Sequence, residues 1–146
     1  VELAVSLGDD LAPTKAAVAI DMTARDVQAS LSSEGKPWTL AKSFPASCPY
    51  TPAFNLTDQI CLQELTLVLQ VNGTERQRSS TGLMIFPVAT IIDYLKRYFP
   101  VEPDDLVLTG TPAGVGQLQP GDVVCAWVED QRGTVLSKGT WHCVAS

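Results

Sequence analysis

The chain has 146 residues, a net charge of −6, 45% hydrophobic residues and 18% charged residues, a composition typical of a folded globular domain. Its 10 lysines and arginines are scattered, which argues against a nucleic-acid-binding surface, because such a surface needs clustered basic side chains. No hydrophobic run reaches the roughly 20 residues that span a bilayer, and the first residues lack the basic start of a secretory signal. We therefore expect a cytoplasmic protein that does not bind a membrane.

Four cysteines are present, and no two of them form a CxxC pair. They are Cys48, Cys61, Cys125 and Cys143. Their spacing argues against a zinc site or a thioredoxin-like redox pair. A disulfide framework is not expected in a chain of this size without a secretory signal, so we predict free, buried thiols.

Alternating and continuous apolar segments predict a strand-rich chain. Residues 1–7 alternate in the manner of a half-buried strand, and the apolar run 16–20 predicts a buried strand. The alternation over 65–71 predicts another strand, and the following Asn72-Gly73 is a strong hairpin signal. Further strands are expected at 75–78, 106–108 and 123–128 and near Val135.

Two helices are expected. The first is indicated by signals at its ends: it begins near Thr23, with Thr23 and Asp26 in a capping box, and ends at Gly35. The second spans 88–99, where apolar residues recur at helical spacing. The proline-rich segment 36–58 is expected to be a structured loop. Together these elements predict a single strand-dominated α+β domain, residues 1–146, with two main helices.

Polar side chains cluster where the second predicted strand meets the first helix. Asp21 ends the strand, and Arg25 and Gln28 fall on one face of the helix because they are three residues apart. A carboxylate, a guanidinium and an amide would then converge, as in a binding site. The alternative is a helix N-terminus capped by its own residues, with Arg25 at the surface.

Two other segments combine polar groups with turn or aromatic residues. Lys42 lies in the apolar, aromatic segment 37–44, where it either stabilises an anion in a desolvated site or extends its charge to water. The predicted strand at 106–108 runs into the glycine-rich turn 109–116, which could direct backbone N–H groups and the Thr111 hydroxyl at a carboxylate. This turn lacks the Gly-Lys-Ser/Thr sequence of a nucleotide-binding loop.

Five motifs in order resemble the fumarylacetoacetate hydrolase family, in its branch of acylpyruvate hydrolases, oxaloacetate decarboxylases and hydroxyheptadienedioate isomerases. They are AIDMTARDVQ (19–28), PWTLAKSF (37–44) with a following CP, VNG-x-x-RQ (71–77), MIF (84–86), and TGTPAGVG (109–116) with a following PGD. The match spans nearly the whole chain. It implies a mixed β-roll of the fumarylacetoacetase C-terminal-domain type, usually assembled as a homodimer.

The resemblance also implies a Mg²⁺ or Mn²⁺ ion. Glu2 and Asp21 match two of the family's metal ligands, and a further glutamate ligand would lie immediately before Val1, outside this sequence. Hard carboxylate oxygens are the ligands that Mg²⁺ requires.

A site for a small 2-oxo acid or β-dicarbonyl substrate is implied in the same way. The residues expected to line it are Arg25, Gln28, Lys42 and Thr111. A metal acts on such a substrate as a Lewis acid, and breaking the neighbouring C–C bond leaves an enolate. Lys42 and Gln28 are the predicted catalytic residues because they would stabilise that charge, while Arg25 and Thr111 would orient the substrate.

From this resemblance we expect a divalent-metal-dependent hydrolase that cleaves a C–C bond in acylpyruvate-like 2-oxo acids. The same enolate serves an oxaloacetate-type decarboxylase or a 2-hydroxyhepta-2,4-diene-1,7-dioate isomerase, so the site residues do not separate these reactions. An alternative of another class is a family member that binds 2-oxo acids without turning them over.

Two features depart from the family pattern. Hydrolytic members use a histidine and a glutamate of an N-terminal lid to activate water, but the single histidine here, His142, lies in a predicted strand and is not a candidate base. Related sequences carry a longer segment between Gly8 and Ala16, and this chain begins at Val1 within a strand. We therefore expect an N-terminal segment upstream and residues missing between 8 and 16.

Overall fold

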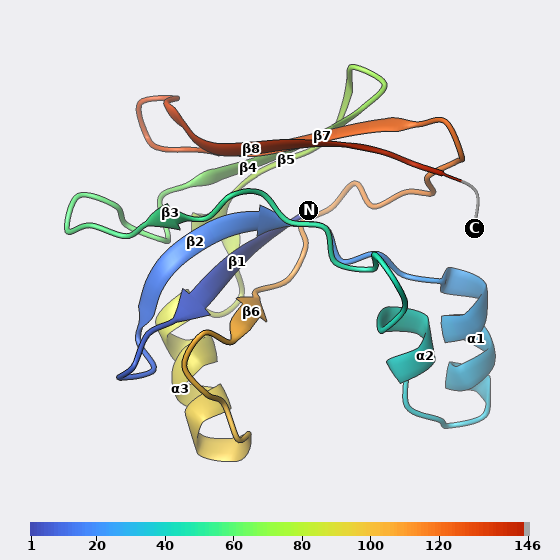
Figure 1. The fold of residues 1–146 in the computed structure, drawn as a ribbon, viewed down its shortest axis with the longest axis horizontal. Helices are drawn as coiled ribbons and strands as arrows, with labels where there is room; N and C mark the ends of the chain where they lie inside the picture. The colour runs from blue at the N-terminus through green and yellow to red at the C-terminus, as the bar shows by residue number, and fades with distance from the viewer. Residues whose placement is uncertain (145–146) are drawn as a thin grey trace.

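The computed structural model describes residues 1–144, which form two four-stranded antiparallel sheets and three α-helices (Figure 1). The first sheet has the order β3-β2-β1-β6, from Phe54–Asn55, Pro13–Ala19, Glu2–Leu7 and Leu106–Leu108. The second has the order β5-β4-β7-β8, from Thr74–Ser80, Thr66–Val71, Val123–Glu129 and Val135–His142. The helices are α1 (Arg25–Ser33), α2 (Thr39–Lys42) and α3 (Val88–Tyr98), with a 3₁₀ turn at Thr81–Leu83. Within the described residues, no helix has the length and apolar character needed to cross a bilayer.

One hydrophobic core is shared by the two sheets. β1 is buried along most of its length because it pairs with β2 on one side and β6 on the other. Leu3 and Val5 of this strand belong to the same core as Val128 of β7 and Ile92 of α3. The predicted strand-dominated α+β class is confirmed, with antiparallel pairing throughout both sheets and a short third helix, α2, beside the two main ones.

The hairpin predicted at Asn72-Gly73 is confirmed. Asn72 has a φ of 52° and Gly73 a φ of 77°, the left-handed pair that a tight two-residue hairpin turn needs. β4 and β5 therefore pair directly across this turn.

The capping box predicted at the start of the first helix is wrong. Helix α1 begins at Arg25, and its N-cap position, Ala24, has no side-chain capping bond. The backbone N–H of Met22 instead donates to Ser47 O at 2.9 Å, and that of Ala24 donates to Ala41 O at 3.0 Å. These bonds tie residues 22–24 to a distant segment, so the helix starts later than local sequence signals indicate.

The segment 36–58 is structured, as predicted, and contains α2 and the short strand β3. The four cysteines are free, as predicted, but the prediction that they are buried is wrong. Cys48 and Cys61 are exposed. Cys125 is half-buried because its neighbours Val124 and Ala126 occupy the core-facing side of β7.

Residues 8–12 form a short connection between β1 and β2. The backbone N–H of Gly8 donates to Ala12 O at 2.8 Å, and that of Leu11, which has a φ of 58°, donates to Gly8 O at 2.8 Å. That further residues are missing between 8 and 16 stays a prediction.

Thr51 links the two sheets through buried hydrogen bonds. Its hydroxyl oxygen accepts from the backbone N–H of Val18 in β2 at 3.0 Å and from the Ser137 hydroxyl in β8 at 2.7 Å. The backbone N–H of Thr51 donates to Val18 O at 2.9 Å. Thr51 is 1% exposed, so water cannot replace these bonds.

Thr51→Val keeps the shape of this side chain but leaves the buried Val18 N–H without its acceptor. We expect the free energy of unfolding to fall by about 1–3 kcal/mol, the cost of an unsatisfied buried donor. The measurement is urea unfolding. Thr140→Val, at an exposed position of β8, is the matched control and should change stability by less than about 0.5 kcal/mol. Equal effects of the two substitutions would show that Thr51 is not a link between the sheets.

Candidate functional site

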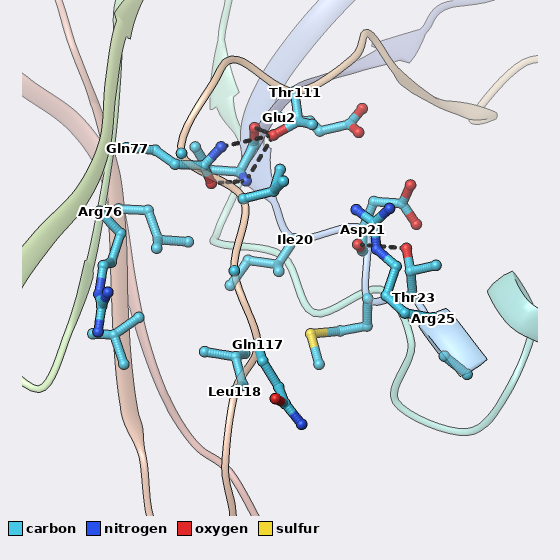
Figure 2. A pocket seen from close by; sticks show the side chains of 18 of the residues that line it. Glu2, Ile20, Asp21, Thr23, Arg25, Arg76, Gln77, Thr111, Gln117 and Leu118 are labelled. Carbon is cyan, nitrogen blue, oxygen red and sulfur yellow. Dashed lines mark hydrogen bonds between the residues drawn. The ribbon is translucent and has the colours of Figure 1, made fainter. Parts of the chain in front are cut away.

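A cavity of about 890 Å³ lies between the start of β1, the end of β2, the β4–β5 hairpin and the glycine-rich turn (Figure 2). Polar side chains dominate the part near β1 and β2, and apolar side chains line the part near β4. The lining residues whose side chains could bind a ligand or take part in chemistry are Glu2, Asp21, Arg25, Asp26, Lys42, Arg76, Gln77, Thr111 and Gln117. The apolar ones include Ile20, Leu69, Val71 and Leu118.

Glu2 and Asp21 come together because β1 and β2 are antiparallel. Glu2 pairs with Ala19, so Asp21 follows just beyond the paired end of β2. Glu2 is 6% exposed, and its Oε2 accepts from the backbone N–H of Gly110 at 2.7 Å. Burial raises the pKa of the Glu2 carboxyl, and the charge of Asp21 raises it further, whereas the Gly110 N–H opposes the rise.

Lys42 ends the short helix α2 and forms an ion pair with Oδ2 of Asp21. The two side chains are 33% and 31% exposed, so the pair is partly shielded from water. Of the two roles open to Lys42 from sequence, the structure favours the one inside a site, because its ammonium group lines the cavity beside a carboxylate.

Gln77 of β5 holds the glycine-rich turn in place. Its Nε2 donates to Thr111 Oγ1 at 3.0 Å and to Pro112 O at 2.9 Å, while its Oε1 accepts from the Val1 nitrogen at 2.8 Å. The Thr111 hydroxyl donates to Val1 O at 2.9 Å. Gln77 is 4% exposed. This residue connects the turn, β5 and the start of β1, and Figure 2 shows it beside Thr111.

The sequence predicted most of the site correctly, but it gave no site role to four polar lining residues, Asp26, Arg76, Gln77 and Gln117. Arg25, the first residue of α1, lines the cavity beside Asp21 (Figure 2). Gln28 is half-buried one turn further along and is not a lining residue, so its catalytic role stays a prediction. Arg76 and Gln77 were not assigned a role, although both lie within the hairpin motif that carried the family resemblance.

His142 is exposed on β8 and does not line the cavity. This agrees with its exclusion as a candidate base.

The carboxylates at this end of the cavity fit a hard divalent cation. No group of three or more histidine, cysteine, aspartate or glutamate side chains in residues 1–144 is arranged to hold a metal. Glu2 nevertheless has an oxygen, Oε1, that accepts no hydrogen bond from the described residues, and Asp21 adds Oδ1 together with Oδ2, which also accepts from Lys42. Mg²⁺ and Mn²⁺ are commonly bound by one or two carboxylates together with water and substrate, so Glu2 and Asp21 match that type of site.

Comparison with known proteins identifies a family and relatives of this chain. The family model of the fumarylacetoacetate hydrolase C-terminal domain matches residues 1–143. The mitochondrial oxaloacetate tautomerase of Caenorhabditis elegans is 44% identical over 107 residues, which cover 73% of this chain and 50% of the relative. The chain thus spans about half the length of the curated relatives it matches.

Two solved structures have the same fold. Fumarylpyruvate hydrolase from Pseudomonas aeruginosa, in complex with Mn²⁺ and pyruvate, superimposes with a TM-score of 0.88 at 32% identity, covering 99% of this chain and 64% of that chain. The 2-hydroxyhepta-2,4-diene-1,7-dioate isomerase of Mycobacterium marinum gives a TM-score of 0.81 at 32% identity, with coverages of 98% and 56%.

Gly114→Ala tests how closely the glycine-rich turn packs on β5. An added Cβ would lie 2.3 Å from the backbone oxygen of Arg76, and Gly114 has a φ of 98°. We expect the free energy of unfolding to fall by about 2 kcal/mol or more, because neither the clash nor the backbone conformation can relax cheaply. The measurement is denaturant unfolding.

Gly116→Ala is the matched control in the same turn, since a Cβ there meets nothing within 4 Å. Its stability should stay within about 0.5 kcal/mol of the original protein. A similar loss for both substitutions would contradict the close packing at Gly114.

Proposed function

We propose that this chain, which belongs to the fumarylacetoacetate hydrolase family, carries the metal- and substrate-binding part of an enzyme that interconverts keto and enol forms of oxaloacetate-like 2-oxo acids. The observation behind the proposal is the convergence of two carboxylates, Glu2 and Asp21, with the ammonium group of Lys42 at one end of a cavity. Curated relatives about 44% identical are oxaloacetate tautomerases, which supports this choice of reaction.

Glu2 and Asp21 would hold Mg²⁺ or Mn²⁺ at the end of the cavity near β1 and β2. When bound there, such an ion supplies Lewis acidity toward the keto oxygen of a 2-oxo acid. The mixture of charges supports an anionic substrate, because Arg25 and Lys42 add two positive charges next to the acidic pair. Arg25 suits the 1-carboxylate of the substrate, since a guanidinium binds a carboxylate with two parallel hydrogen bonds.

Lys42 has the position and charge to stabilise an enolate. Keto–enol exchange moves a proton between the carbon next to the keto group and the keto oxygen, and it passes through an enolate whose negative charge lies on that oxygen. The Lys42 ammonium lines the cavity beside Asp21 and can donate a hydrogen bond to that oxygen. Its ion pair with Asp21 limits the motion of its side chain, which keeps the donor in position before substrate arrives.

Hydrolysis of an acylpyruvate C–C bond, the reaction expected from sequence, is the second candidate. It is favoured by the fold match to a fumarylpyruvate hydrolase bound to Mn²⁺ and pyruvate. The enolate of pyruvate is the leaving group of that hydrolysis, so the same Lys42 would act there. A water-activating base is required only for this second reaction.

Two assays separate the candidates. The protein is loaded with Mn²⁺ and mixed first with the enol form of oxaloacetate, whose ultraviolet absorbance falls as the keto form appears, and then with acetylpyruvate. We expect faster ketonisation of oxaloacetate and no release of acetate from acetylpyruvate. Acetate release without accelerated ketonisation would replace the proposed reaction by hydrolysis.

Lys42→Ala and Asp21→Ala should fail in different ways. Lys42→Ala removes the enolate donor and should lower kcat by about a hundredfold or more, while Mn²⁺ titrated by calorimetry still binds. Asp21→Ala removes a ligand and should abolish the Mn²⁺ binding signal itself.

Lys36→Ala is the control for loss of a positive charge. Lys36 is exposed, pairs with Glu34 at 2.5 Å and lies outside the cavity lining. It should leave both measurements unchanged. Normal turnover in Lys42→Ala would remove Lys42 from the mechanism.

A further inference from the structure

Arg76 faces the cavity because β5 contains a β-bulge. Leu69 pairs with Gln77 and Gln70 pairs with Glu75, so Arg76 is an extra residue with no partner across the ladder. In a regular strand the neighbours Arg76 and Gln77 would point to opposite faces. Here both line the cavity. Bulges commonly redirect a side chain next to a functional site.

Charge pairing on β5 distinguishes Arg76 from the other arginine of the strand. Arg78 forms ion pairs with Glu75 at 2.9 Å and Glu129 at 3.1 Å, outside the cavity. Arg76 forms no ion pair and donates no side-chain hydrogen bond among residues 1–144. The pKa of the Asp122 carboxyl is lowered chiefly by the hydrogen bond from the Gln119 N–H and then by that from Asn72, and the charge of Arg76 makes a smaller contribution.

Asp122 forms no ion pair with Arg76. Its two carboxylate oxygens accept from Asn72 Nδ2 at 2.7 Å and from the backbone N–H of Gln119 at 2.8 Å. All five donors of the Arg76 guanidinium are therefore available to a ligand in the cavity.

The position of Arg76 gives the cavity a second polar end. Figure 2 shows Arg76 on the β5 side, with Asp21 and Arg25 on the opposite side. The wall between them is apolar and includes Ile20 and Leu118. Gln117, which directly follows the glycine-rich turn, adds an amide to the lining. A ligand that reaches from the acidic end to Arg76 needs a carbon chain to cross the apolar wall and a second anionic group to meet the guanidinium.

We propose that Arg76 binds the distal carboxylate of a dicarboxylic 2-oxo acid whose keto-acid end lies at Glu2 and Asp21. The inference rests on the proposed function for the identity of the proximal group. It adds the substrate class: Arg76 selects dicarboxylates over monocarboxylates through a bidentate guanidinium–carboxylate pair. Arg76 is thus a specificity-determining residue and takes no part in proton transfer.

Malate and lactate are suitable probes because they are stable 2-hydroxy acids that differ by the second carboxylate. Their dissociation constants are measured by calorimetry on the Mn²⁺-loaded protein, with Arg76→Gln and Arg78→Gln as matched variants. Arg76→Gln should weaken malate binding by about tenfold or more, the usual effect of losing a charged hydrogen-bond pair, and leave lactate binding unchanged. Arg78→Gln should alter neither.

The outcomes separate this inference from the proposed function. Unchanged malate affinity in Arg76→Gln, or an equal loss for malate and lactate, would overturn the role of Arg76. If the protein does not ketonise oxaloacetate but Arg76→Gln still loses malate selectively, the subsite stands and the proposed reaction fails. If ketonisation is confirmed, Arg76→Gln should raise the KM for oxaloacetate and leave kcat nearly unchanged.

Discussion

The placement of two carboxylates at one end of the β1–β2 pair is the constraint on which the rest of the site depends. Glu2 is buried within a strand that pairs on both sides, so it cannot turn away from the cavity without disrupting the sheet. Burying a negative charge next to another is unfavourable unless positive charge or hydrogen bonds compensate for it. The Gly110 N–H and the Lys42 ammonium supply part of that compensation. A divalent cation would supply the rest, which is the physical reason to expect one here.

The β-bulge in β5 links the shape of the site to its substrate range. Because of the bulge, Gln77 can hydrogen-bond to the glycine-rich turn while the neighbouring Arg76 also lines the cavity. The same turn packs so closely on the bulge that Gly114 has no room for a side chain. The Gly110 N–H of this glycine-rich turn donates a hydrogen bond to the Glu2 carboxylate. A change in the bulge would therefore alter the carboxylate end and the distal end of the cavity together.

Sequence patterns predicted the parts of the molecule that local chemistry decides. The alternation in 65–71 and the Asn72-Gly73 turn are almost sufficient by themselves to determine a hairpin. The position of Asp21 at the end of the second strand was also predicted correctly. The family resemblance is confirmed by the match over residues 1–143. It grouped Glu2, Asp21, Arg25, Gln28, Lys42 and Thr111, and all of these except Gln28 line one cavity.

The wrong or missing predictions arise where distant segments decide the outcome. The start of α1 is displaced because the backbone N–H groups of Met22 and Ala24 bond to Ser47 and Ala41 in a later segment of the chain. The exposure of Cys125 depends on which face of β7 meets the core, and the role of Arg76 depends on an extra residue in the pairing of β5 with β4. A single-residue irregularity in strand register reverses the direction of a side chain. No local pattern in residues 74–80 predicts such an irregularity. Lys42 and the acidic pair would serve each of the enolate reactions considered for this site, so the choice of substrate must come from other residues that line the cavity. Arg76, held at the far end of the cavity by the bulge, is such a residue.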